Sequence, residues 1–241
     1  MKPTNVEIVF AIDTSESMRP CIEGLSKNID RLIQPFQGYN FNVRFGLLGY
    51  SVGKNDSGGF LISTVTLDGD LTSIYENSKK LFTDNPKEFS QKIKELQLAG
   101  DENHLIALDC AFDFPFGPVN NTRRVVCLFS DEKIEDGAIK ADLAEQIIEK
   151  LMEKATARKI LLFMALPESP LLQLLGQIRY AEIQKVNGGD GLASLNFSSL
   201  LESMGKSISI SSIQGQEKEY ERAIHGQDKW GTSNGSFEGL R

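Results

Sequence analysis

The chain has 241 residues, of which 33 are acidic and 26 are basic, so its formal net charge is −7 at pH 7. An acidic balance of this size lacks the basic surface that binding to a phosphate backbone requires, and nucleic acid is therefore not an expected partner. A hydrophobic fraction of 40% can build a sizeable core, but the longest apolar run, at 160–166, is far shorter than the roughly 20 residues of a membrane-spanning helix.

The predicted elements alternate between strands and helices from the start of the chain. Residues 6–12 form an almost continuous apolar run, which is typical of a strand buried on both faces. After a polar stretch at 13–17, apolar residues recur every three or four positions and predict an amphipathic helix that ends near Phe36. A second strand is expected at 42–50, and the segment 60–67 is expected to pair with it as a hairpin.

The alternation continues through the second half of the chain. The expected elements are helices at 73–82, 87–98 and 104–112, a strand at 125–129, a helix carrying Ile139, Leu143, Ile147 and Leu151, a strand at 160–166, a helix at 171–178, a strand at 182–186 and a helix at 197–208. Strands that alternate with helices imply βαβ crossovers. We therefore predict an α/β fold, a Rossmann-like three-layer sandwich whose mostly parallel six-stranded sheet has one antiparallel edge strand.

The periodic pattern fails near the C-terminus. We divide the chain into a domain at 1–212 and a C-terminal tail or docking extension at 213–241, which contains five glycines and few large apolar side chains. One alternative is a terminus that makes no contact. The other is a second attachment point, because buried Trp side chains tend to dominate interface energies. The candidate partner-binding residues are the three large aromatic side chains of the tail, Tyr220, Trp230 and Phe237.

The cysteines and the first residues suggest where the protein resides. Cys21, Cys110 and Cys127 form no Cys-x-x-Cys pair, and each lies in an apolar stretch, which is typical of buried free thiols in a reducing compartment. Residues 1–5 carry one basic residue, and Glu7 interrupts the apolar run that follows, so no secretory signal is expected. We therefore expect a cytoplasmic protein without a membrane segment.

The segment most informative about function is 13–17, which lies between the first strand and the first helix. Asp13, Ser15 and Ser17 are alternate residues of one tight turn at the carboxyl end of a strand, where ligands collect in open α/β sheets. A carboxylate and two hydroxyls that converge on one point suit a hard cation such as Mg²⁺. In isolation, the same pattern is also explained by capping of the following helix by one of the serines.

Two further acidic turns are expected at the same edge of the sheet. The strand at 125–129 leads into Asp131, and the turn at 100–103, which precedes a helix, contains Asp101. Because the carboxyl ends of parallel strands meet at one edge, we expect these turns to face the segment 13–17. Three acidic turns exceed what helix capping requires, so the sequence predicts a divalent-cation site with oxygen ligands.

These residues show a resemblance to a known family. Over about 5–210, the chain resembles the von Willebrand factor A domain family, through Asp13, Ser15 and Ser17, the strand–helix order and Asp131. The resemblance implies that the first and fourth strands are central and adjacent, with a metal-ion-dependent adhesion site where they end. The three residues at 13–17 would then form its first loop and Asp131 its third. The short middle loop and the lack of an expected signal peptide resemble the intracellular, bacterial-type branch.

The middle loop departs from the family pattern. The family usually supplies a threonine hydroxyl there, whereas residues 97–105 contain no Ser or Thr, and Asp101 is the nearest match. One additional like charge at ~4 Å is worth about 4 kcal/mol at an effective dielectric constant near 20. We therefore expect firm binding of Mg²⁺, with Ca²⁺ or Mn²⁺ as alternatives, and a partner that offers a neutral oxygen or a basic residue as often as an acid.

The resemblance implies protein–protein interaction rather than catalysis. Intracellular relatives act as adaptors in larger stress-response, defence or signalling machines, so one or more protein partners are expected. One alternative is a metal-dependent phosphatase or phosphotransferase of the haloacid dehalogenase type that uses Asp13. In that class an acid stands two residues after the nucleophile, and Ser15 at this position cannot give the general-acid proton at neutral pH. A structural subunit without a metal is the third alternative.

Overall fold

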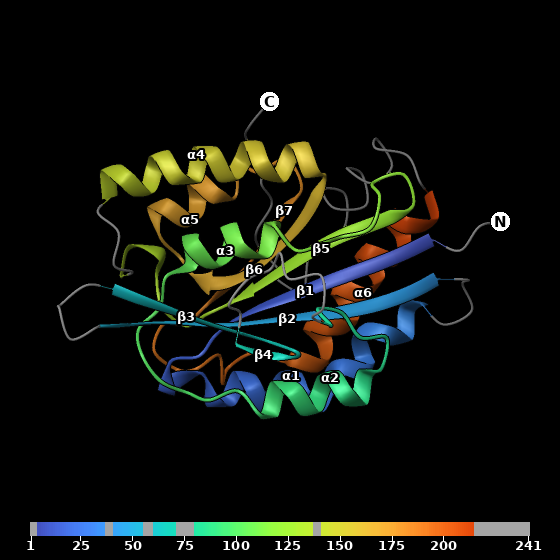
Figure 1. Cartoon of the computed structure of the whole chain (residues 1–241), viewed down its shortest axis with the longest axis horizontal. Coiled ribbons are helices and arrows are strands. Elements are labelled where there is room, and N and C mark those ends of the chain that lie inside the picture. The colour runs from blue at the N-terminus through green and yellow to red at the C-terminus, as the bar shows by residue number, and fades with distance from the viewer. Residues whose placement is uncertain (1–3, 37–40, 55–59, 71–79, 137–140, 215–241) are drawn as a thin grey trace.

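The computed structural model describes residues 4–36, 41–54, 60–70, 80–136 and 141–214 (Figure 1). Within these ranges one sheet contains the strands β1 (Thr4–Asp13), β2 (Phe41–Lys54), β3 (Phe60–Thr66), β4 (Gly69–Asp70), β5 (Thr122–Phe129), β6 (Ile160–Pro167) and β7 (Ala181–Val186). The helices are α1 (Arg19–Ile33), α2 (Pro86–Lys94), α3 (His104–Phe112), α4 (Ala141–Arg158), α5 (Pro170–Leu175) and α6 (Phe197–Gln214). Single 3-10 turns lie at Glu16–Met18, Gln34–Phe36 and Ile134–Asp136.

The sheet has the predicted mostly parallel topology. Its strand order is β4-β3-β2-β1-β5-β6-β7, and the five strands from β2 to β7 in this order are parallel. The first and fourth predicted strands, β1 and β5, are neighbours at the centre, as the family resemblance implied. One detail differs from the prediction, because the antiparallel strand β3 is not outermost. The chain reverses after Thr66, and Gly69, with φ of +99°, begins the two-residue strand β4 that pairs with β3.

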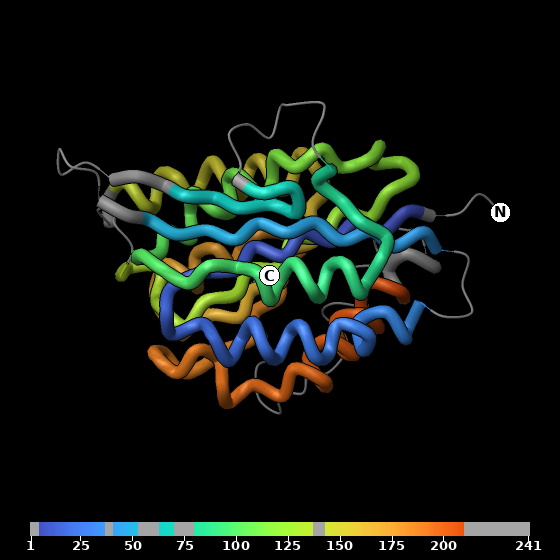
Figure 2. The backbone as a smooth tube through the Cα atoms, turned by 60° about the horizontal axis from the view of Figure 1, so that its bottom comes forward, coloured from blue at the N-terminus to red at the C-terminus, as the bar shows by residue number. Residues whose placement is uncertain are grey.

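Helices cover both faces of the sheet and complete the three-layer sandwich (Figure 1). One face is covered by α1, α2 and α6, and Figure 2 shows α1 lying between the other two. The other face is covered by α3, α4 and α5. Each face has its own hydrophobic cluster, and β1 contributes to both, with Phe10 packed on one side and Val9 on the other. A strand buried on both faces explains the continuous apolar run in the sequence.

Helices α1 and α6 approach each other closely at two glycines. The ring of Phe197 covers Gly24, where an added Cβ would lie 2.2 Å from a ring carbon. At Gly205, an added Cβ would lie 2.3 Å from the carbonyl oxygen of Leu32. A backbone oxygen cannot move away by a change of rotamer, so the contact at Gly205 is the stricter of the two.

The substitution Gly205→Ala is therefore expected to lower the free energy of unfolding by about 1–3 kcal/mol, which is the typical cost of overpacking a protein core. This loss would occur even though alanine is about 1 kcal/mol better than glycine in a helix interior. Urea unfolding measures the change, and Lys206→Ala, at the exposed neighbouring position, is a control that should change stability by less than about 0.5 kcal/mol. A Gly205→Ala variant as stable as wild type would contradict the close packing of the two helices.

Several other expectations can be compared with the described part of the chain. All three cysteines are free; Cys21 and Cys127 are buried, and Cys110 is partly buried. No described helix combines the length and apolar character needed to cross a bilayer. The helix expected at 73–82 lies mostly outside the described residues. Nearly all of the tail is also outside them, including all three of its candidate partner-binding residues, Tyr220, Trp230 and Phe237.

Candidate metal centre

The candidate centre lies where the two central strands end. β1 and β5 are parallel and in register, with Ile12 opposite Phe129, so the residues that follow them leave the sheet side by side. Asp13 is the last residue of β1, and Ser130 and Asp131 directly follow β5. The topology therefore brings the first and third predicted loops together across a gap of more than 100 residues in sequence.

A continuous set of hydrogen bonds joins the two loops. Asp13 accepts hydrogen bonds from the backbone N–H of Ser15 at Oδ1 (2.7 Å) and from the hydroxyl of Ser130 at Oδ2 (2.7 Å). The hydroxyl of Ser17 donates to Oδ1 of Asp131 (2.9 Å). The Oγ atoms of Ser15 and Ser17 lie 3.1 Å apart. Four of the five predicted ligands thus form one cluster, together with Ser130, which was not among the predicted ligands.

Both carboxylates of this cluster are buried. The side chains of Asp13 and Asp131 are fully shielded from solvent. Burial raises the pKa of Asp13 and the charge of Asp131 adds to this effect, while hydrogen bonds from Ser15 and Ser130 oppose it. In the described part of the chain, no lysine or arginine pairs with either carboxylate. Since buried charges are normally compensated, the cluster is suited to a cation.

The loop between β7 and α6 holds Asp131 in place, a contact that was not predicted from the sequence. Gly191 N–H donates to Oδ2 of Asp131 (2.7 Å), and Gly189 N–H donates to its backbone carbonyl (2.9 Å). Gly191 has φ of +60°, and a Cβ added there would lie 1.9 Å from the carbonyl oxygen of Ser17. Only glycine fits this position. The signal in the sequence was the Gly-Gly-Asp-Gly run between the last strand and the last helix.

The fifth predicted ligand, Asp101, lies outside the hydrogen-bonded cluster. Its backbone forms an isolated bridge with Val52, with N···O distances of 2.5 and 2.8 Å. Gly100 allows this approach, because its φ is +85° and an added Cβ would lie 2.8 Å from the Val52 carbonyl oxygen. The side chain of Asp101 is exposed. The bridge therefore fixes the backbone of the middle turn while leaving this carboxylate at the surface.

The next residue, Glu102, is buried instead, with 8% of its surface exposed. Burial raises the pKa of its carboxyl group to about 7, and the charges of Asp13, Glu132 and Asp101 add to the effect. Glu102 was not among the predicted ligands. The middle turn thus contributes a buried carboxylate close to the charge of Asp13.

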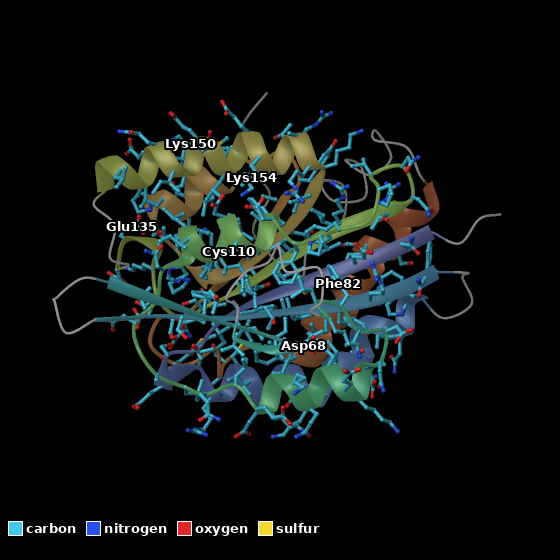
Figure 3. All side chains as sticks on the ribbon, viewed as in Figure 1. Asp68, Phe82, Cys110, Glu135, Lys150 and Lys154 are labelled. Carbon is cyan, nitrogen blue, oxygen red and sulfur yellow. The ribbon has the colours of Figure 1, made fainter. Side chains whose placement is uncertain are left out.

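Another acidic side chain at this end of the molecule has a structural explanation. Glu135, labelled in Figure 3, accepts a hydrogen bond from the backbone N–H of Leu171 (2.8 Å). Leu171 lies in the first turn of α5, where backbone N–H groups lack partners within the helix. Glu135 therefore caps a helix and is not needed to explain the metal centre.

The donor set fits a hard cation. Across the described residues, no group of three or more His, Cys, Asp or Glu side chains is arranged to hold a metal ion. The cluster has a different composition, since it combines two carboxylates with the hydroxyls of Ser15 and Ser17. Mg²⁺ is bound in proteins by one or two carboxylates and retains several waters, so oxygen ligands of this number and kind are sufficient.

A buried histidine lies beneath the middle turn. His104 is 1% exposed, and its ring meets that of Tyr50 edge-on at 6.2 Å between centroids. Neither ring nitrogen has a hydrogen-bond partner within the described ranges. Burial lowers the pKa of His104 to about 3, so the imidazole is neutral at physiological pH.

His104 is therefore expected to make the folded protein sensitive to acid. An unfolded histidine binds a proton below pH 6.5, whereas the buried one resists protonation down to about pH 3, so stability is lost as pH falls between these values. Between pH 7 and 5 this loss is about 2 kcal/mol. His104→Phe should reduce the loss of unfolding free energy by this amount, as measured by urea unfolding at both pH values. Equal losses in variant and wild type would show that His104 is not the buried neutral group.

Comparison with known proteins supports the fold. No protein-family model matches the chain, and no curated protein matches it. Similar solved structures include a von Willebrand factor type A protein from Catenulispora acidiphila (15% identity, TM-score 0.51), proximal thread matrix protein 1 from the mussel byssus (13%, 0.50) and the open conformation of the pilus adhesin SpaC from Lactobacillus rhamnosus GG (13%, 0.53).

These alignments cover 85%, 85% and 88% of this chain, respectively. They cover only 43%, 49% and 31% of the other chains, so this chain spans less than half of each of those proteins. At such low identity the likeness establishes the fold alone.

Proposed function

Since the chain has a von Willebrand factor A-like fold, we propose that it is a protein–protein interaction adaptor whose recognition surface is organised by a divalent cation. Mg²⁺ is the proposed ion, with Ca²⁺ or Mn²⁺ as alternatives. The observation that supports this proposal is the cluster of Asp13, Ser15, Ser17 and Asp131, in which two buried carboxylates lack a basic partner among the described residues.

Each residue of the cluster has a distinct role in this proposal. A bound cation would supply a Lewis-acidic centre that attracts an oxygen ligand from the partner. Ser130 and the Ser15 N–H hold the carboxylate of Asp13, and Ser17 and the Gly191 N–H hold that of Asp131. Because these contacts fix both carboxylates before an ion arrives, little reorganisation is needed for binding.

The negative charge around the centre influences which kind of partner can bind. Exposed or half-exposed acids, among them Glu16, Asp101 and Glu132, surround the cluster, and Arg19 and Lys133 are the nearby basic residues in sequence. An incoming carboxylate would be repelled by this rim. We therefore propose a partner that offers a neutral oxygen or a basic residue as often as an acid.

The wider role is proposed by analogy with the family. We place the chain in the cytoplasm as a non-enzymatic subunit of a stress-response, defence or signalling machine. The tail would be a second attachment point through Tyr220, Trp230 and Phe237. Partner capture that is unchanged after deletion of residues 214–241 would remove the tail from this proposal. Turnover of generic phosphoesters that requires Asp13 would replace the adaptor by an enzyme.

Thermal melting and partner capture test the metal-dependent adaptor. Mg²⁺ at a hundredfold excess over its dissociation constant should stabilise wild type by about 2.7 kcal/mol, relative to EDTA. The Asp13→Ala variant should show no such gain, and neither Ca²⁺ nor Mn²⁺ should restore it. Capture of a protein partner should require the cation and be lost in the variant. If EDTA and Asp13→Ala left both the melting curve and the capture unchanged, the metal-dependent function would be wrong.

A further inference from the structure

A groove lies between α1 and the segment that leads into α6. Its volume is about 400 Å³, which is within the range of ligand-binding clefts. One wall is a side of α1, where Pro20, Glu23 and Lys27 recur at steps of three and four residues. The other wall is formed by residues of the segment 193–198, which ends in the first turn of α6. Two elements that are distant in sequence thus form one concave surface.

Part of the lining of this groove is apolar. The ring of Phe197 covers Gly24 and is almost fully buried. Ala193 is exposed, and Leu195 is half-buried against the hydrophobic cluster on this face of the sheet. Both side chains can lose exposed apolar surface when a ligand binds, which favours binding by about 25 cal/mol per Å². This part of the groove therefore suits a small apolar side chain.

Two asparagines supply polar groups to opposite walls of the groove. The Nδ2 group of Asn28 donates to the carbonyl oxygen of Gly24 (2.9 Å), and its Oδ1 accepts no hydrogen bond from a described residue. The Oδ1 atom of Asn196 accepts from the Ser199 N–H (3.1 Å), and within the described ranges its Nδ2 group has no acceptor. One wall thus presents a free acceptor and the other a free donor. A peptide backbone carries one N–H donor and one C=O acceptor at most residues, so it can satisfy both.

The groove carries no net charge. Glu23 and Lys27 form an ion pair on α1 (3.0 Å), and no other charged side chain of the described residues lines the groove. This distinguishes it from the acidic surroundings of the candidate metal centre. A neutral surface attracts neither an acidic nor a basic ligand, and a ligand charge that loses water there would find no partner to compensate it. An uncharged ligand therefore fits best.

One end of the groove adjoins the candidate metal centre. Pro20 packs against Gly191, where an added Cβ would lie 2.7 Å from the Cδ atom of Pro20. Gly191 is the residue whose N–H donates to Asp131, and it lies two positions before Ala193. A protein chain bound at the centre can therefore continue directly into the groove.

We propose that the groove binds an extended, uncharged segment of the partner protein. The backbone of this segment would donate to Asn28 and accept from Asn196, and a small apolar side chain would lie on Leu195. The inference rests on the proposed adaptor function, because its occupant belongs to a protein partner. It goes beyond that function by assigning a second contact surface, which does not involve the cation.

Selection from random peptides displayed on phage tests this inference. The full-length protein is immobilised in EDTA, so that no peptide can be selected through a bound cation, and the affinities of the selected peptides are measured by fluorescence anisotropy. Ala193→Trp fills the groove, and Ser194→Trp is the matched control at the next exposed position, outside the lining. We expect peptides with an uncharged stretch that bind Ala193→Trp at least tenfold more weakly than wild type, and Ser194→Trp within twofold of wild type.

A second variant tests the groove without adding bulk. Asn196→Asp keeps an oxygen that can cap α6, because aspartate is as good an N-cap as asparagine, but it replaces the free donor with a negative charge. The same peptides should bind this variant at least tenfold more weakly. Its melting temperature should equal or exceed that of wild type, since a negative charge is favourable at a helix N-terminus.

The outcomes separate this inference from the metal-dependent function. If no selected peptide is weakened by Ala193→Trp and by Asn196→Asp, the groove is not a docking site and the inference is wrong, although the metal-dependent adaptor stands. Selected peptides that need a charged side chain for binding would also contradict it. The peptides should bind equally well in EDTA and in Mg²⁺, so loss of the metal-dependent function would leave a positive result for the groove intact.

Discussion

Replacing Asp13 with asparagine is expected to reverse the order of stability between variant and wild type when Mg²⁺ is added. In EDTA the variant should be more stable than wild type. With Mg²⁺ at a hundredfold excess over its dissociation constant, wild type should gain about 2.7 kcal/mol and the variant should gain nothing. The two melting curves should therefore exchange places.

The reversal follows from the contacts of Asp13. An asparagine oxygen can still accept the hydrogen bond from the Ser15 N–H, and its amide can donate to the Ser130 hydroxyl, which has acceptor capacity. The geometry is thus preserved while one of two buried negative charges is removed. Burial and the nearby charge of Asp131 raise the pKa of Asp13. The ionised carboxylate is therefore less favourable in the metal-free folded protein than in the unfolded chain.

Differential scanning calorimetry in EDTA and in Mg²⁺ measures both halves of this prediction. The matched control is Asp136→Asn, an exposed acid in the same segment of the chain as Asp131, which should respond to Mg²⁺ as wild type does. A variant that is less stable than wild type in EDTA by the same margin as in Mg²⁺ would mean that Asp13 has a purely structural role.

Much of the fold was predictable because its signals are local. The run at 6–12 contains only one charged residue, Glu7, and its apolar side chains lie buried on both faces of the sheet. This pattern is sufficient to place Asp13 at the end of a central strand. The alternation of strands and helices then places Asp131 at the same edge of the sheet, whereas only the family resemblance implied that the two strands are neighbours. Short-range periodicity, together with the rule that parallel strands share one edge, accounts for both positions.

The features of the centre that were not predicted depend on contacts between distant residues. Gly191 binds a carboxylate 60 positions earlier in the chain, and the Gly-Gly-Asp-Gly run gives no indication of its partner. The burial of Glu102 rather than Asp101 depends on a single bridge to Val52, about 50 residues away. Two adjacent acids on one turn are equivalent in sequence, and tertiary pairing alone decides which of them is buried.

The opposite end of the sheet contains a buried ion pair whose disruption should have the largest effect on stability. Glu7, on β1, is 1% exposed and pairs with Arg44, on β2. Its other oxygen accepts a hydrogen bond from the Gly117 N–H (2.7 Å). The guanidinium of Arg44 lies 5.1 Å from the ring centroid of Phe82, which Figure 3 shows at the other end of the molecule from Glu135.

Arg44→Met is expected to lower the free energy of unfolding by about 3 kcal/mol, because it removes the ion-pair partner of the buried Glu7 carboxylate. The Gly117 N–H and the charge of Arg124, the neighbour of Glu7 on β5, remain. Removal of one partner of a buried ion pair typically costs about 3–5 kcal/mol. We expect the lower value here, because the Arg44 side chain is 39% exposed. Adding Glu7→Gln should recover part of this loss, because the amide oxygen can still accept from the Gly117 N–H and the buried negative charge is removed. Urea unfolding of the two single variants and the double variant forms a thermodynamic cycle. Strictly additive losses would mean that the two side chains do not stabilise each other, whereas a less destabilised double variant identifies the uncompensated charge as the cause.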